Sequence, residues 1–241
     1  MGRFFDMDNR FFTFMSRVSD LIILNLLCIL CCLPIVTAGA SITAMFYVTL
    51  KMVRNEEAYI AKSFFKSFKQ NLKQSIIINL IMLVTGALLY FDLTISKSMS
   101  GLPGKALSVI FMMILLLYVM VFIYIYPVLA KFYNTTKNTF INAFLMAIRH
   151  LPYTLLMLLI TALPVAILYI PTFKVQSLVL LLFVLIGFAA IAYINSHFFV
   201  KIFDNYIPKE THRQRKTSWN RRMIPRYPVH DQLERQALSF S

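Results

Sequence analysis

The sequence predicts an all-α fold, a polytopic transmembrane bundle of six helices, with five helices as the alternative. The chain of 241 residues is 59% hydrophobic with a mean hydropathy of +0.70, whereas soluble domains contain roughly 45–50% apolar residues. Its long apolar runs are continuous and free of charge, which is typical of membrane-spanning helices and not of the alternating strands of a barrel. These runs occupy most of the chain and leave no room for a separate soluble domain of ordinary size.

The transmembrane domain is expected to comprise residues 1–206. Its crossings are predicted at about 18–36, 38–53, 75–92, 106–130, 151–170 and 178–203. The first two come from one uncharged stretch, Leu21–Leu50, which would be about 45 Å long as a single helix. A bilayer core is only about 30 Å thick. Because Pro34 disrupts a helix and Gly39 permits a turn, we expect two short helices joined by an outer turn.

The distribution of basic residues predicts the orientation of the chain. With six crossings, 21 of the 24 Lys and Arg residues fall on one side of the membrane. Cytoplasmic loops retain Lys and Arg, so the N- and C-termini are both expected to be cytoplasmic. With five crossings, Arg3, Arg10 and Arg17 would move outside and only 18 of the 24 would remain inside. Six crossings are therefore preferred, and five remain open.

Residues 55–74 are expected to form an amphipathic helix at the inner membrane surface. An apolar stripe is flanked by lysines, the stripe being Ala61, Phe65, Phe68 and Leu72 and the lysines Lys62, Lys66, Lys69 and Lys73. Aromatic side chains can enter the head-group boundary while lysines extend toward water. The segment is either a simple membrane-surface helix or a docking helix for a partner protein.

Residues 207–241 are predicted to be a basic, disordered cytoplasmic tail, because they contain too few apolar residues to build a core. The whole chain has a net charge of +14. In a membrane protein, such a charge indicates contact of the basic loops and tail with anionic lipid head groups. The lipid bilayer is therefore the expected partner, and no nucleic acid is expected.

Recognisable catalytic motifs are absent from the sequence. It contains no Gly-rich phosphate loop, no His-Glu-x-x-His and no Gly-x-Ser-x-Gly, the patterns that mark common nucleotide-binding, metalloprotease and hydrolase sites. The three cysteines all lie in the first apolar stretch, with no His or carboxylate at the spacing of a zinc site. We therefore expect no catalytic residue, metal ligand or cofactor, and no enzymatic activity.

Four polar residues are expected within the apolar runs: Asn25, Asn79, Asn195 and His197. These side chains could line a polar cavity used in transport. Amides in membrane helices more often form hydrogen bonds between helices. A single shared cavity would favour a transporter, whereas pairing between helices would favour a structural role.

The stretch LPIVTAGASITAMFYVTLKMVRNEEAYIAKSFFKSFKQNLKQS resembles the signature region of the YesL family of integral membrane proteins of Gram-positive bacteria, a domain-of-unknown-function family. The matching positions are Leu33, Pro34, Ile35, Val36, Thr37, Gly39, Ala44, Tyr47, Lys51, Arg54, Glu57, Tyr59, Phe64, Phe65, Phe68 and Asn71. The resemblance implies five or six helices, a place in the bacterial cytoplasmic membrane and no established catalytic residues. Such proteins tend to be encoded beside carbohydrate ABC transporters, their sensor kinases and polysaccharide-degrading enzymes.

Two functions follow from these observations. The first is an accessory or regulatory component of carbohydrate uptake, which would bind an ABC transporter or sensor kinase through the helix that carries Glu57, Phe65, Phe68 and Asn71. The second is an independent small-molecule transporter or flippase that uses the polar residues at depth. The scarcity of carboxylates within the apolar runs argues against ion coupling in such a transporter.

Overall fold

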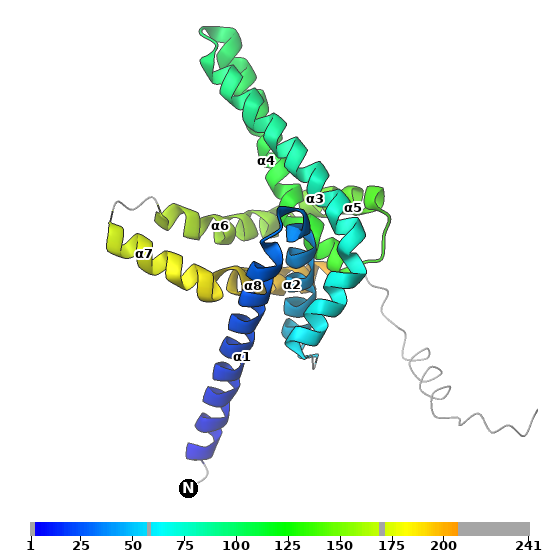
Figure 1. Cartoon of the computed structure of the whole chain (residues 1–241). Helices are drawn as coiled ribbons and strands as arrows, with labels where there is room; N and C mark the ends of the chain where they lie inside the picture. Colours follow the sequence, from blue (N-terminus) through cyan, green and yellow to red (C-terminus); the bar gives the residue numbers. More distant parts are fainter. Residues whose placement is uncertain (1–2, 57–58, 169–171, 207–241) are drawn as a thin grey trace, which may run out of the picture. The chain divides into compact units, whose positions relative to one another are not determined.

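The computed structural model describes residues 3–56, 59–168 and 172–206, and within them it contains helices and no strand. The elements are α1 (Arg3–Cys32), η1 (Ile35–Thr37), α2 (Ala38–Val53), α3 (Ile60–Ser98), α4 (Leu102–Lys131), α5 (Thr136–Arg149), α6 (Leu151–Leu168), α7 (Phe173–Leu182), η2 (Phe183–Gly187) and α8 (Phe188–Phe203) (Figure 1). The predicted all-α class is confirmed. Residues Met1–Ile202 form one compact unit and Phe203–Ser241 a second, and the expected tail lies outside the described residues.

Several helices are long and apolar enough to cross a membrane. Among the described residues these are Phe11–Cys32, Ile35–Val53, Ile60–Ser98, Leu102–Lys131 and Phe173–Phe203. A sixth span is reached if α5 and Leu151–Pro164 of α6, which meet at a bend of 99°, are counted as one. The protein is thus a multi-pass membrane protein with five or six candidate crossings.

The break predicted in the first apolar stretch is present. α1 ends at Cys32, and the 3₁₀ turn η1 leads directly into α2. The hydroxyl of Thr37 donates to the carbonyl oxygens of Cys31 at 2.8 Å and Pro34 at 2.9 Å. The bond to Cys31 satisfies one of the carbonyl groups that the end of α1 leaves without intrahelical partners.

Helix α3 differs from the expectation. A surface helix at 55–74 and a crossing at 75–92 were predicted as separate elements, but one continuous helix of 39 residues covers both from Ile60 onward. The sequence contains no Pro or Gly between Ile60 and Thr85, so nothing in this segment disrupts the intrahelical hydrogen bonds. The lysine-rich segment and the apolar segment are therefore two parts of one helix.

Helices α3 and α4 form an antiparallel hairpin (Figure 1). The connection turns at Gly101, whose φ of 90° is a conformation that glycine adopts without a steric penalty. Near this turn, Ser108 donates a hydrogen bond to Ser96 at 3.1 Å. Further along, the Tyr118 hydroxyl donates to the carbonyl oxygen of Met82 at 2.9 Å. The hairpin is therefore held by polar bonds as well as by apolar packing.

The interior of the first unit is close-packed around α2. Ala40 and Ala44 are fully buried, and small residues of this kind let membrane helices approach closely. An aromatic cluster joins α2, α4 and α8, since the ring of Phe199 meets Tyr124 edge-on at 5.1 Å and Phe46 at 5.8 Å between centroids. Many large apolar side chains are exposed instead, as expected where the surrounding solvent is lipid.

Candidate functional site

The three amides predicted within the apolar runs are all buried. Asn25 is fully buried, and Asn79 and Asn195 are 7% and 2% exposed. They lie on α1, α3 and α8, respectively. Their hydrogen-bond partners determine whether they form one site.

Asn25 binds the backbone where the last crossing departs from α-helical geometry. η2 is a π-helix, a form in which hydrogen bonds join residues five apart, so that backbone pairing changes register at its ends. The Asn25 Nδ2 group donates to the carbonyl oxygens of Phe183 at 3.3 Å and Val184 at 2.6 Å, and its Oδ1 accepts from the N–H of Ala189 at 2.9 Å. One side chain therefore contacts three backbone groups in a region where lipid offers no partner.

Asn79 joins three elements at a point where they approach closely. Its Nδ2 donates to the carbonyl oxygen of Ile35 in η1 at 2.9 Å, and its Oδ1 accepts from the Tyr126 hydroxyl of α4 at 3.0 Å. Gly39 lies against this group, because a Cβ atom there would be 2.9 Å from Cβ of Asn79 and 3.0 Å from the carbonyl oxygen of Ser75. Both hydrogen-bonding atoms of the amide are therefore paired between helices.

Asn195 makes a different contact. Its Nδ2 donates to the Thr161 hydroxyl on α6 at 3.2 Å, and that hydroxyl donates to the carbonyl oxygen of Met157 at 2.7 Å. The Asn195 Oδ1 atom is buried and has no hydrogen-bond partner among the described residues. A buried acceptor without a partner carries a free-energy cost of about 1–3 kcal/mol.

His197 is exposed, and its Nδ1 lies 3.0 Å from the carbonyl oxygen of Tyr193 in the preceding turn. Arg17, which the sequence analysis did not identify as a site residue, donates to the Tyr193 hydroxyl at 2.7 Å and to Oδ1 of Asn55 at 2.6 Å. Arg17 thus connects α1 to α8 and to the turn after α2. The sequence signal for this contact is the position of Arg17 within the candidate span Phe11–Cys32, because a charged residue in a membrane helix usually has a polar partner on another helix.

The four predicted polar residues do not converge. Each of the three amides contacts a different part of the unit. None of them lines the apolar groove between α4 and α6 or the smaller cavity at the ends of α2 and α4. Buried hydroxyl pairs extend the same pattern. The hydroxyl oxygens of Thr49 and Ser196 lie 2.8 Å apart, and those of Tyr124 and Thr154 lie 2.9 Å apart. Hydrogen bonding between helices accounts for these contacts.

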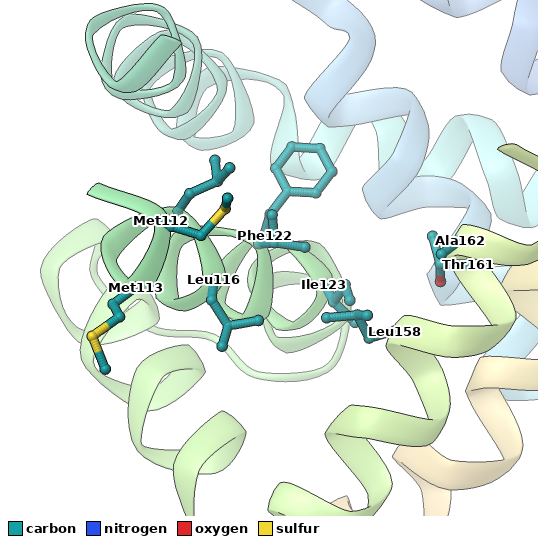
Figure 2. Close-up of a pocket in the computed structure, with 10 residues that line it drawn as sticks. Met112, Met113, Leu116, Phe122, Ile123, Leu158, Thr161 and Ala162 are labelled. Atoms are coloured by element: carbon teal, nitrogen blue, oxygen red, sulfur yellow. The ribbon is translucent and has the colours of Figure 1, made fainter. Parts of the chain in front are cut away.

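An apolar groove of about 500 Å³ lies between α4 and α6 (Figure 2). Met112, Met113 and Leu116 line it on the α4 side and Leu158 and Ala162 on the α6 side. Thr161 is the hydroxyl-bearing residue of the lining. Such a lining suits an alkyl chain or another apolar group and offers no charged side chain to a soluble substrate.

The predicted docking residues lie at the start of α3, except Glu57, which lies outside the described residues. Phe65 is 42% exposed, whereas Phe68 is half-buried and stacks on the fully buried Phe64 with 6.1 Å between ring centroids. The Asn71 amide donates to the carbonyl oxygen and the hydroxyl of Ser67 within the same helix. Of these residues, Phe65 offers the most accessible apolar surface.

Comparisons with known proteins point to one family. The family model described as "Protein of unknown function, DUF624" matches residues 21–93, which include Asn25, Phe65 and Asn79. The protein of Bacillus subtilis (strain 168) named "Uncharacterized protein YesL" is 28% identical over 150 residues, covering 62% of this chain and 70% of that protein. No solved structure matches the chain.

Proposed function

We propose that this chain is a member of the DUF624 family of YesL-like proteins, which its residues 21–93 match, and that it is an accessory or regulatory membrane protein of carbohydrate uptake and not an enzyme. The observation that carries the proposal is the contrast between its interior and the start of α3. In the interior, the amide nitrogen and the amide oxygen of both Asn25 and Asn79 have hydrogen-bond partners. An aromatic and basic face is left exposed on α3.

This face, termed the α3 face, consists of Phe65 with Lys62, Lys66 and Lys69, all exposed, and the half-buried Phe68. An aromatic centre surrounded by charged groups is the usual composition of an energetically important part of a protein interface. The lysines would favour a partner surface with acidic groups around an apolar recess. The face lies at one end of a helix whose remainder is apolar enough to cross the membrane.

The partner class follows from the family resemblance and not from the geometry. Relatives tend to be encoded beside carbohydrate ABC transporters and their sensor kinases, so we propose one of these membrane complexes as the partner. Both have cytoplasmic parts close to the membrane, where the α3 face would lie if the basic loops are inside. The chain would then modulate uptake or sensing by contact, with no chemistry of its own.

The test is co-purification of the tagged full-length protein from native membranes of cells grown on a complex polysaccharide. Replacing an interface aromatic at an energetic centre costs about 2 kcal/mol or more, which corresponds to roughly a 30-fold loss of affinity. Phe65→Ala with Phe68→Ala should therefore strongly reduce recovery of the permease or sensor kinase.

The matched control is Tyr90→Ala with Phe91→Ala. These residues form an adjacent, exposed aromatic pair on the same helix, with 6.0 Å between ring centroids, but lie near its other end. The control should leave recovery unchanged. Equal recovery of partner with the Phe65 and Phe68 variant, at equal membrane insertion, would reject the docking role.

The transporter or flippase remains a second candidate because of one observation. The unpartnered Oδ1 of Asn195 belongs to a side chain bound to Thr161, which lines the groove between α4 and α6. A small rotation could present a polar acceptor to an amphipathic molecule in that groove. Flux through vesicles containing the purified protein, abolished by Asn195→Leu and retained in Asn71→Leu, would support this function in place of the first.

A further inference from the structure

A second, smaller cavity differs in chemistry from the apolar groove. It has a volume of about 210 Å³ and lies where α2 and α4 end. Lys51, Arg54 and Lys131 line it together with one carboxylate, Glu56, and the two aromatic residues Tyr47 and Tyr133. The charged residues of the lining therefore carry a net charge of +2. This set of residues is termed the basic pocket.

We propose that the basic pocket binds a phosphate group, supplied by the head group of an anionic phospholipid or by a soluble phosphate compound. The cationic side chains can donate several hydrogen bonds at once, because an ammonium group has three N–H donors and a guanidinium group five. Each can keep its contacts within the protein and still donate to phosphate oxygens. The geometry of Arg in particular suits two parallel hydrogen bonds to one phosphate.

Lys51 is already positioned by the pocket wall. Its ammonium group lies 4.9 Å from the centroid of the Tyr47 ring, a distance at which the face of an aromatic ring attracts a cation. Lys51, Arg54 and Lys131 are all partly buried. Cations held with little water around them interact more strongly with an anion than cations on freely solvated side chains.

The position of the pocket along the helices favours the lipid as the source of the phosphate. The apolar spans of α2 and α4 end at Val53 and Lys131, so the basic pocket lies at the boundary where head groups begin. Basic pockets between membrane helices at this depth bind anionic head groups. The volume of about 210 Å³ is below the range of roughly 300–1,000 Å³ for drug-sized ligands and suits a small head group.

Stabilisation of helix ends is the competing explanation. Cations near the C-terminus of a helix interact favourably with its dipole, and both α2 and α4 have a basic residue in the last turn. That role needs no ligand and makes no distinction between anionic and neutral lipids. The two explanations therefore differ in a measurable way.

The experiment measures binding of phosphatidylglycerol, phosphatidylcholine and inorganic phosphate to the full-length protein in detergent by native mass spectrometry. The pocket variant is Lys51→Gln with Lys131→Gln. The control is Lys97→Gln with Lys105→Gln, which removes equal charge from exposed positions beside the turn between α3 and α4. Loss of two charge-assisted hydrogen bonds should weaken phosphatidylglycerol binding by about tenfold or more in the pocket variant only.

The outcomes separate the two sources. Selective loss of phosphatidylglycerol binding identifies the head group, and selective loss of inorganic phosphate binding identifies a soluble compound. The proposal is overturned if the pocket variant binds both ligands as the control does. Lys131→Gln alone provides a milder variant with the same expected direction should the double variant not fold. The inference does not depend on the docking role proposed for the α3 face.

Discussion

Asn25 on α1 donates a 2.6 Å hydrogen bond to the carbonyl oxygen of Val184 inside the π-helix η2. Val184 lies 159 positions after Asn25 in the sequence. The same amide also donates to the carbonyl oxygen of Phe183 and accepts from the N–H of Ala189. A departure from α-helical geometry in the last crossing is thus accommodated by a side chain of the first.

Replacing Asn25 with Leu should destabilise the protein because three backbone groups lose a partner inside the membrane. Each buried group left unpaired costs about 1–3 kcal/mol, although relaxation of η2 would recover part of this. The measurement is the midpoint of unfolding in mixed micelles, together with hydrogen exchange at the Ala189 amide, which should accelerate. Asn71→Leu is the control because its amide bonds only within its own helix in the contacts described above. Equal stability of the two variants would contradict the assigned role.

Gly39→Ala should destabilise the contact between α2 and α3. A Cβ there would meet the backbone oxygen of Ser75 at 3.0 Å and Cβ of Asn79 at 2.9 Å, and neither atom can move without shifting a helix. Overpacking of this kind costs about 1–3 kcal/mol. Gly86→Ala is the comparison, because its nearest neighbour is the tip of the Tyr118 side chain. Thermal unfolding should show a larger loss for Gly39→Ala, and the reverse order would reject the close approach.

Thr49 and Ser196 should be energetically coupled. Their hydroxyl oxygens are 2.8 Å apart, and both side chains are fully buried. A double-mutant cycle with Thr49→Val and Ser196→Ala should give a coupling free energy of about 0.6 kcal/mol, with 1.7 kcal/mol as an upper value for such pairs in a membrane. Additive effects of the two substitutions would show that the bond contributes nothing.

The cytoplasmic location of both termini is a prediction from the basic residues. In a variant without the three native cysteines, a Cys at position 2 should be shielded from a membrane-impermeant thiol reagent in intact cells. A Cys replacing Ser100, in the turn between α3 and α4, should be labelled, because that turn is predicted to be outside. Strong labelling at position 2 would contradict the six-crossing arrangement and favour five.

Sequence patterns predicted the helical class and the break near Pro34, because apolar runs and proline act locally. They predicted a separate surface helix before Ser75, but local charge alone does not end a helix, and the segment from Ile60 to Thr85 contains no Pro or Gly that would interrupt it. The π-helix at Phe183–Gly187 had no signal strong enough to predict it. The partners of Asn25 and Asn79 could not be predicted either, since both depend on contacts between distant helices.

The most direct test of the central claim is site-specific photo-crosslinking in living cells from position 65 of the tagged chain, with position 90 as the reference on the same helix. The account predicts that position 65 crosslinks to a carbohydrate ABC permease or its sensor kinase during growth on a polysaccharide, and that position 90 does not. Crosslinks from both positions to lipid alone, or to a second copy of this chain alone, would contradict the accessory role.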